Sequence, residues 1–193
     1  MYRKDKKEEF YTKKSKEEGY PARSVYKLKE IDETFNLFKK GHRILDLGSA
    51  PGSWLLYLSE KAGFVLGIDE QEITPKRKNI FFIKKSILDE DILEALGQEK
   101  FDSVLADLSP KTTGIKSLDS GLSLELCQRA FFIAQKVLRP KGNFVCKIFE
   151  SAEADGFFKS VSSSFESARR FRPKAVIKKS KEIYIVAKGY KNV

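Results

Sequence analysis

The sequence predicts an α/β fold built on a doubly wound, mostly parallel β-sheet. Short apolar runs alternate with segments of helical spacing through most of the chain, a rhythm typical of consecutive β-α-β units. Residues 170–190 differ, because two strand-like pieces flank a basic loop there. This ending predicts a terminal hairpin with at least one antiparallel strand.

A helix is expected before the sheet. Between residues 24 and 38 apolar side chains recur at steps of three or four, the spacing of one helix face; they are Val25, Leu28, Ile31, Phe35 and Phe38. The first 20 residues are highly charged and are predicted to form a basic N-terminal arm, as a frayed helix or a flexible segment. Residues 21–193 are expected to form a single domain.

Strands and helices are predicted to alternate after the turn at Lys40 and Gly41. The expected strands are residues 42–47, 64–69, 80–83, 101–107 and 142–149. The expected helices are residues 52–62, 89–97, 120–138 and 153–164, with a polar turn between the second and third strands.

Composition excludes several classes of protein. Hydrophobic residues make up 41% of the 193 residues, which is enough for a sizeable core and argues against global disorder. No apolar run approaches the roughly 18 residues of a membrane span, and the start has no apolar signal region, so a cytoplasmic protein without membrane contact is expected. The two cysteines and single histidine have no metal-ligand spacing, so neither a metal nor a disulfide framework is expected.

The net charge of +10 is concentrated at the two ends of the chain. Residues 1–40 hold 12 Lys and Arg against 8 Asp and Glu, and residues 165–193 hold 9 against 2, which leaves the middle nearly neutral. A neutral body with basic ends suits a polyanion that lies across the surface near both termini. A merely solubilising surface is the alternative.

The stretch ILDLGSAPGSW, residues 44–54, is predicted to be a strand that turns tightly into a helix. Gly48 and Gly52 permit the turn, Pro51 stiffens it, and the start of the helix supplies free N–H groups. The next strand ends in Asp69, 23 residues after Asp46, where a carboxylate can accept both hydroxyls of a ribose. Ligands bind at this edge of an open parallel sheet.

This loop favours S-adenosylmethionine as the ligand. It lacks the GxGxxG pattern of dehydrogenases, and an acid precedes its first glycine. The two acids favour S-adenosylmethionine over NAD, because the former brings a sulfonium and an amino group where the latter brings a pyrophosphate. An ordinary tight turn is the alternative interpretation of the glycines.

Five segments in order, SVYKLKEI, DLGSAPGSW, ADLSP, VCKIFE and SKEIYIV, resemble the FtsJ/RrmJ family of RNA ribose 2′-O-methyltransferases. The resemblance runs from about residue 10 to residue 190. It implies a Rossmann-like, S-adenosylmethionine-dependent methyltransferase fold, with a seven-stranded, mostly parallel sheet and an antiparallel last strand. It also implies a Lys-Asp-Lys-Glu catalytic tetrad, which falls on Lys27, Asp107, Lys147 and Glu182.

The chemistry of ribose methylation gives these four residues separate roles. A 2′-hydroxyl is a poor nucleophile, so a base must remove its proton as the oxygen attacks the methyl group. Neutral Lys147, at the end of an apolar strand, is the expected base, and Asp107 is expected to orient its amine. Lys27 and Glu182 are expected to position the ribose. Without the family match, a solvated surface charge is an equally good interpretation of each.

The resemblance also implies the cofactor-binding residues: Asp46, Gly48, Gly52, Trp54, Asp69, Ser86 and Asp107. Three positions depart from the family pattern. Ser53 replaces the second glycine of APGGW, and Lys111 stands where an asparagine is usual. Ser86 stands where many members have an acid that contacts the adenine, so that contact is lost or is supplied by nearby Asp89.

The expected function is S-adenosylmethionine-dependent 2′-O-methylation of a ribose in RNA. The favoured substrate is large-subunit ribosomal RNA in the assembled or assembling subunit. The alternatives are a tRNA 2′-O-methyltransferase and a non-catalytic, RNA-binding ribosome assembly factor. The protein is expected to be a monomer that needs no metal. Basic side chains are expected to hold phosphates on both sides of the target ribose; they are Arg23, Lys27, Arg169, Arg170, Arg172, Lys174, Lys178, Lys179 and Lys181.

Overall fold

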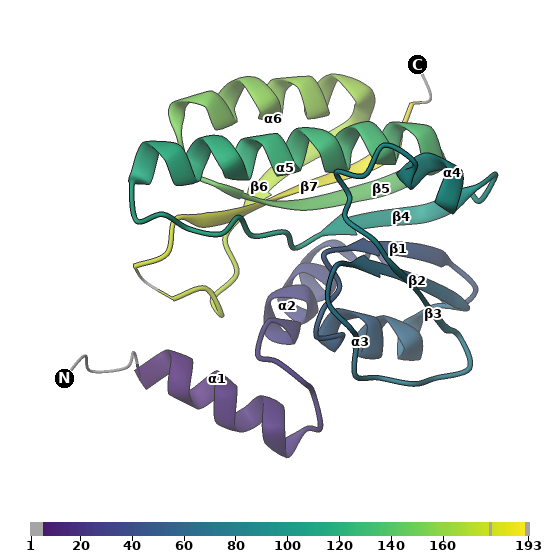
Figure 1. Cartoon of the computed structure of the whole chain (residues 1–193), viewed down its shortest axis with the longest axis horizontal. Coiled ribbons are helices and arrows are strands. Elements are labelled where there is room, and N and C mark those ends of the chain that lie inside the picture. The colour runs from purple at the N-terminus through teal and green to yellow at the C-terminus, as the bar shows by residue number, and fades with distance from the viewer. Residues whose placement is uncertain (1–5, 178, 192–193) are drawn as a thin grey trace.

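The computed structural model describes residues 6–177 and 179–191 (Figure 1). The helices are α1 (Lys6–Glu17), α2 (Val25–Phe35), α3 (Ser53–Lys61), α4 (Ile92–Leu96), α5 (Lys116–Val137) and α6 (Ala152–Ser164). The strands are β1 (Arg43–Leu47), β2 (Phe64–Asp69), β3 (Ile80–Lys84), β4 (Phe101–Ala106), β5 (Leu138–Phe149), β6 (Phe165–Phe171) and β7 (Glu182–Tyr190).

The strands form one seven-stranded sheet in the order β3-β2-β1-β4-β5-β7-β6. Neighbours from β3 to β5 are parallel, and β7 is antiparallel to both β5 and β6. This confirms the predicted fold class, including the antiparallel last strand. The strand order reverses between β1 and β4, so the carboxyl ends of these strands diverge to open a crevice where ligands bind in such sheets.

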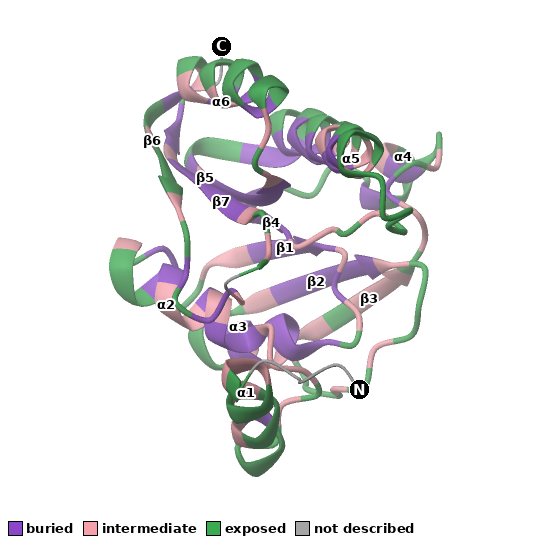
Figure 2. Cartoon of the chain, turned by 90° about the vertical axis from the view of Figure 1, so that its left-hand side faces the viewer, coloured by how far each residue is buried: buried purple, intermediate pink, exposed green. Residues whose placement is uncertain are grey.

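Helices cover both faces of the sheet and bury a core on each. In Figure 1, α4, α5 and α6 lie on one side, and α2 and α3 lie on the other. Along β1, Leu45 and Leu47 join the first core, whereas Ile44 joins the second. Figure 2 shows the buried strands and the exposed outer faces of the helices. Strands buried on both faces read as continuous apolar runs, which is why the sequence revealed them.

Some predicted boundaries were wrong. The first strand of the terminal hairpin is β6, which begins at Phe165, earlier than expected, and ends before Pro173. It is the edge of the sheet and several of its side chains are exposed, so FESARRF lacks the apolar signal of a central strand. Helix α2 ends at Phe35 because Asn36 takes a left-handed conformation with φ of 51°; Phe38 is still buried beyond the helix.

The described part of the N-terminal arm is helix α1, which lies against the body of the protein. The Tyr11 and Tyr26 rings are 5.1 Å apart, and the Arg23 guanidinium is 3.1 Å from the Glu8 carboxylate. Lys7 donates a hydrogen bond to a main-chain carbonyl of the β6–β7 loop. Residues 1–5 of the predicted arm lie outside the described residues, and flexibility of the arm stays a prediction.

The aromatic cluster under α5 and α6 is expected to dominate the stability of the fold. Phe144 is fully buried, with its ring 5.5 Å from Phe131 and 6.4 Å from Phe165. Phe144→Ala is expected to lower the free energy of unfolding by about 3–5 kcal/mol in urea denaturation, through lost burial and a residual cavity. Half-exposed Phe81→Ala should lower it by at most about 1 kcal/mol; equal losses in both variants would contradict this account.

Candidate active site

The four residues of the predicted tetrad meet at the carboxyl edge of the sheet. Lys27 lies in the first turn of α2, and Asp107 directly follows β4. Lys147 lies near the end of β5, and Glu182 begins β7. Because β7 runs antiparallel to β5, its first residues pair with the last residues of β5, with Lys147 opposite Tyr184. The sheet topology thus gathers residues that are far apart in the sequence.

Two ion pairs join these four side chains. The Lys27 ammonium is 2.6 Å from the Glu182 carboxylate, and the Lys147 ammonium is 3.2 Å from the Asp107 carboxylate. The Lys147 side chain is only 4% exposed and that of Asp107 14%, whereas those of Lys27 and Glu182 are 15% and 21% exposed. Lys147 therefore lies at the bottom of the site, with the second pair nearer the surface.

The Lys147 ammonium has an acceptor for each of its three hydrogens. Besides the Asp107 carboxylate, it donates to the main-chain oxygen of Asp107 at 3.1 Å and to the Ser109 hydroxyl at 2.5 Å. Ser109 lies in the motif ADLSP, but its residue type and position in the sequence do not indicate this contact. Ser109 is exposed, so it stands between the buried amine and solvent.

Asp107 is held in its charged form. Burial alone would raise the pKa of Asp107, but the ammonium groups of Lys147 and Lys27 and a hydrogen bond from Tyr184 outweigh burial and lower it. The Tyr184 hydroxyl donates this bond at 2.8 Å. Burial, together with the charges of Asp107 and Glu182, raises the pKa of Tyr184, so it keeps its proton. Tyr184 was not among the predicted site residues; it follows Glu182 by two residues and so shares its face of β7.

A cavity of about 320 Å³ opens beside Asp107 at the ends of β1 and β2. Of the predicted cofactor residues, Gly48, Asp69, Ser86 and Asp107 line it. The remaining three, Asp46, Gly52 and Trp54, are not in its lining. This cavity adjoins the tetrad through Asp107 and Ser109, so a ligand held here lies next to the Lys147 amine.

Asp46 is a buried acid without a partner. It is 1% exposed, and neither carboxylate oxygen has a hydrogen-bond partner within the protein. Burial raises the pKa of Asp46 well above its usual range, and the nearby charges of Asp107 and Asp69 raise it further. An unpaired buried carboxylate among other acids is unfavourable until a cation approaches. The sulfonium and amino group of S-adenosylmethionine meet that requirement.

Asp69 is oriented by the main chain around the loop after β1. One carboxylate oxygen accepts the Ala50 N–H at 2.9 Å, and the other accepts the Gln71 N–H at 2.8 Å. Each oxygen keeps a lone pair for a further donor. This arrangement fits a carboxylate that receives the two hydroxyls of a ribose, as the sequence predicts.

The loop glycines are required by backbone conformation and by packing. Gly48 has φ of 79° and Gly52 has φ of 105°, both in the left-handed region. A Cβ on Gly48 would lie 2.7 Å from the Leu108 side chain, and one on Gly52 would overlap Pro75. The tight turn is therefore confirmed.

Trp54 lies in the core between α2 and α3. Its indole N–H donates to the Ser24 carbonyl at 3.0 Å, and its ring is 6.2 Å from that of Tyr184. Trp54 thus braces α3 against the residue that precedes α2, one turn from Lys27. Its predicted role in cofactor binding stays a prediction.

The far wall of the cavity is a loop that Arg129 clamps. The Ser86 hydroxyl accepts a hydrogen bond from the Leu88 N–H. The Asp89 carboxylate accepts the Ser86 N–H at 3.1 Å, so this carboxylate is turned towards the main chain. From α5, Arg129 donates to the carbonyls of Ile87 and Asp89 at 2.8 and 2.9 Å. Arg129 was not among the predicted site residues; the signal that could have indicated it is a charged residue between buried positions of α5.

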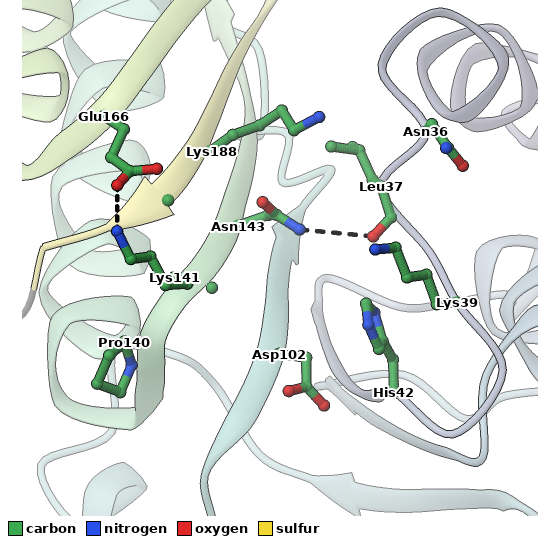
Figure 3. Close-up of a pocket in the computed structure, with 12 residues that line it drawn as sticks. Asn36, Leu37, Lys39, His42, Asp102, Pro140, Lys141, Asn143, Glu166 and Lys188 are labelled. Carbon is green, nitrogen blue, oxygen red and sulfur yellow. Dashed lines mark hydrogen bonds and ion pairs between the residues drawn. The ribbon is translucent and has the colours of Figure 1, made fainter.

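A second cavity, of about 390 Å³, lies at the other end of the parallel strands, away from the tetrad (Figure 3). Most of its charged side chains have partners within the protein: Lys141 pairs with Glu166, and Lys188 donates to a carbonyl at the end of α2. Asp102 pairs with Arg139. No residue of the predicted tetrad lines this second cavity, whereas Asp107 lines the first.

The described residues contain neither a membrane-spanning helix nor a cluster of metal ligands. No helix in residues 6–177 and 179–191 is long and apolar enough to cross a membrane. Within the same residues, no group of three or more potential metal ligands comes together.

Comparison with known proteins gives a consistent result. The family model described as FtsJ-like methyltransferase matches residues 20–190. "Ribosomal RNA large subunit methyltransferase E" of Desulforapulum autotrophicum is 43% identical over 187 residues, which cover 94% of this chain and 92% of that protein. The protein of the same name from Bdellovibrio bacteriovorus is 42% identical, over 91% of this chain and 93% of that one.

Solved structures share the fold. A Plasmodium falciparum chain described as a ribosomal RNA methyltransferase superposes with a TM-score of 0.78 at 26% identity, over 89% of this chain and 98% of that chain. Human methyltransferase-like protein 13, in complex with SAH (S-adenosylhomocysteine), has a TM-score of 0.55 at 14% identity, over 78% of this chain and 72% of that one.

Asp46→Asn is expected to stabilise the protein without cofactor. A carboxyl group with a higher pKa in the folded state binds more protons there, so stability falls as the pH rises above about 4, the usual aspartate value. The amide removes this penalty, so the melting temperature should rise at pH 7 and change little at pH 4, while calorimetric affinity for S-adenosylmethionine falls at least about tenfold.

Exposed Asp91→Asn is the matched control for this test. The Lys85 hydrogen bond lowers the pKa of Asp91, so its substitution should not raise the melting temperature. A melting temperature of Asp46→Asn below wild type at pH 7, with cofactor affinity unchanged, would contradict the role given to Asp46.

Arg129→Met is expected to weaken cofactor binding by about tenfold in calorimetry. It removes two hydrogen bonds that fix the wall of the cavity, each of which contributes about 1 kcal/mol. Gln128→Met, at an exposed neighbouring position on α5, should bind as wild type does. Equal affinities of the two variants would show that the clamp does not shape the cofactor cavity.

Proposed function

This chain belongs to the FtsJ-like methyltransferase family, and we propose that it transfers a methyl group from S-adenosylmethionine to a ribose 2′-hydroxyl of large-subunit ribosomal RNA. The observation that carries the proposal is the pair of ion pairs, Lys27 with Glu182 and Lys147 with Asp107, beside a cavity with an unpaired buried acid. The substrate is supported by relatives that are 42–43% identical and named for it.

The residues around the cavity divide the cofactor among them. The Asp46 carboxylate, which is buried outside the cavity lining, would add negative charge for the positive groups, Asp69 would receive the ribose hydroxyls, and Ser86 with the clamped loop would form the wall for the adenine. When bound, S-adenosylmethionine supplies an electrophilic methyl group on its sulfonium sulfur. The fit depends on charge, because three carboxylates in a small volume favour a cationic ligand over a phosphate-bearing one.

Lys147 acts as the base for the ribose hydroxyl. It does so only after its ammonium has released to solvent the proton that it donates to Ser109, because the neutral amine has two N–H donors and one lone pair. The main-chain oxygen and one carboxylate oxygen of Asp107 accept the two N–H donors of Lys147, so the lone pair points towards Ser109 and the open side of the site. The 2′-hydroxyl approaches from that side and gives its proton to Nζ. The resulting ammonium then has an acceptor for each hydrogen, which stabilises it as the proton arrives.

The outer ion pair positions the ribose. The Lys27 and Glu182 side chains are more exposed than that of Lys147, and beyond their mutual bond Lys27 keeps N–H donors and Glu182 keeps acceptor lone pairs for sugar hydroxyls. Lys27 also lowers the pKa of Asp107, so it keeps the acceptor of Lys147 charged. A ribose that displaces water from this pair lies directly above the catalytic amine.

Some of the basic residues expected to hold phosphates have other partners. Arg170 pairs with Asp155 at 2.6 Å and lies 4.6 Å from the Phe158 ring centroid. Arg172 donates to the carbonyl of Ser180 in the β6–β7 loop and to that of Glu182 at the start of β7, so it fixes the end of this loop.

The better candidates for phosphate contact are exposed lysines of the β6–β7 loop. Lys174, Lys179 and Lys181 are all exposed there, while Lys178 lies outside the described residues. Their charges give salt-dependent affinity for RNA with little dependence on its sequence. We also propose that the protein works as a cytoplasmic monomer, since one chain supplies all four members of the tetrad.

Lys147→Ala is expected to lower methylation of undermodified large ribosomal subunits by at least about 100-fold, the usual contribution of a general base. Labelled methyl transfer should be measured on subunits, free ribosomal RNA and tRNA. Affinity for S-adenosylmethionine should stay within about twofold, because Lys147 does not line the cofactor cavity.

The control is Lys159→Ala, which removes an exposed lysine on α6. It should methylate as wild type does. Near wild-type transfer by Lys147→Ala would refute its role as base. Label on tRNA alone would refute the ribosomal substrate, and cofactor binding without transfer to any RNA would favour a non-catalytic assembly factor.

A further inference from the structure

The first turns of α5 extend beyond the sheet on the side of the tetrad. The Cys127 thiol donates to the Lys147 carbonyl at 2.9 Å, so this turn of α5 lies beside the catalytic lysine. Leu118 lies nine residues earlier, about 14 Å along the helix axis. Figure 1 shows the start of α5 beyond the strand ends, on the side where the β6–β7 loop also projects.

Two apolar side chains are exposed on this overhang. Ile115 is 59% exposed and Leu118 is 48% exposed; Ile115 is the residue directly before α5, and Leu118 lies in the first turn of α5. The loop before them is fixed by the Asp119 carboxylate, which accepts the Thr113 N–H at 2.6 Å and the Gly114 N–H at 3.2 Å. The two side chains therefore point outward from an ordered segment and contribute nothing to either core.

The depth of the catalytic amine determines what reaches this overhang. The Lys147 side chain is 4% exposed, so a target ribose must enter below the protein surface. A nucleotide can do so only after it leaves its helical stack, which exposes the faces of neighbouring bases. Apolar side chains such as Leu and Ile stabilise distorted nucleic acid by inserting between bases.

The charges around the overhang favour nucleic acid over a protein partner. Lys111 and Lys116 flank the two apolar side chains, and both are exposed. Lys27 lies within the tetrad, and exposed lysines of the β6–β7 loop add further positive charge. An apolar pair among cations suits an RNA strand, whose bases are apolar on their faces and whose backbone is anionic.

We propose that Ile115 and Leu118 form a wedge that stacks on a nucleobase next to the methylated ribose. This inference rests on the proposed function and names the part of the RNA that the overhang contacts. The wedge holds open the gap that the extruded nucleotide leaves, so that the ribose stays within reach of Lys147.

The test uses the double variant Ile115→Ser/Leu118→Ser. Methylation of undermodified large subunits is expected to fall at least about tenfold in kcat/KM, since stacking contributes about 1–3 kcal/mol per base. Leu118→Phe should keep activity, because an aromatic ring also stacks on a base. Phe132→Ser removes a side chain that is 40% exposed elsewhere on α5 and should have no effect.

Two further measurements separate stacking from other causes. The slope of log KM against log salt should be unchanged in the double variant, whereas Lys111→Ala/Lys116→Ala should make it shallower. Calorimetric affinity for S-adenosylmethionine should equal that of wild type, which excludes misfolding.

Three results would overturn the wedge. The first is a kcat/KM of the double variant within twofold of wild type. The second is a loss of kcat/KM in Phe132→Ser as large as that in the double variant. The third is a double variant that methylates subunits poorly but binds protein-free ribosomal RNA as tightly as wild type does. The last would assign the overhang to a ribosomal protein. Failure of the wild-type protein to methylate any RNA would instead refute the proposed function.

Discussion

The buried ion pair between Lys147 and Asp107 is the constraint on which the site depends. A buried pair gains little net stability, because both charges lose hydration, yet removal of one partner leaves the other charge exposed to a low-dielectric interior. The protein meets this constraint with several elements at once. β4 and β5 lie side by side to bring the pair together, α2 adds the charge of Lys27, and antiparallel β7 adds the Tyr184 hydroxyl.

The cofactor cavity shows the opposite arrangement, with charge left unbalanced. Asp46, which is not in the lining, keeps no partner, and it is close enough to feel the charges of Asp69 and Asp107, which do line the cavity. Stability is thereby reduced in the free protein and is recovered when a cationic ligand binds. In the proposed function the strongly paired tetrad and the unpaired Asp46 are thus suited to different tasks: the tetrad holds Lys147 and its acceptor in position, and Asp46 supplies negative charge for the methyl donor.

The sequence was sufficient for the central part of the fold and for the tetrad. Apolar strands buried on both faces, such as β1, give a strong signal, and motif positions predicted Lys27, Asp107, Lys147 and Glu182 at one edge of the sheet. Edge strand β6 was misplaced because its polar residues follow no apolar pattern. Tyr184 and Arg129 were missed because their roles depend on hydrogen bonds between elements, which no local spacing reveals.

The most direct test of the account is the identity of the methylated nucleoside. Undermodified large subunits should be incubated with the wild-type protein and labelled S-adenosylmethionine, and their RNA digested to nucleosides for mass spectrometry. The account predicts that the label is found in a single 2′-O-methylnucleoside, with the methyl group on the ribose. Label on a nucleobase, or none in ribosomal RNA, would contradict a site in which Lys147 receives the proton of a ribose hydroxyl.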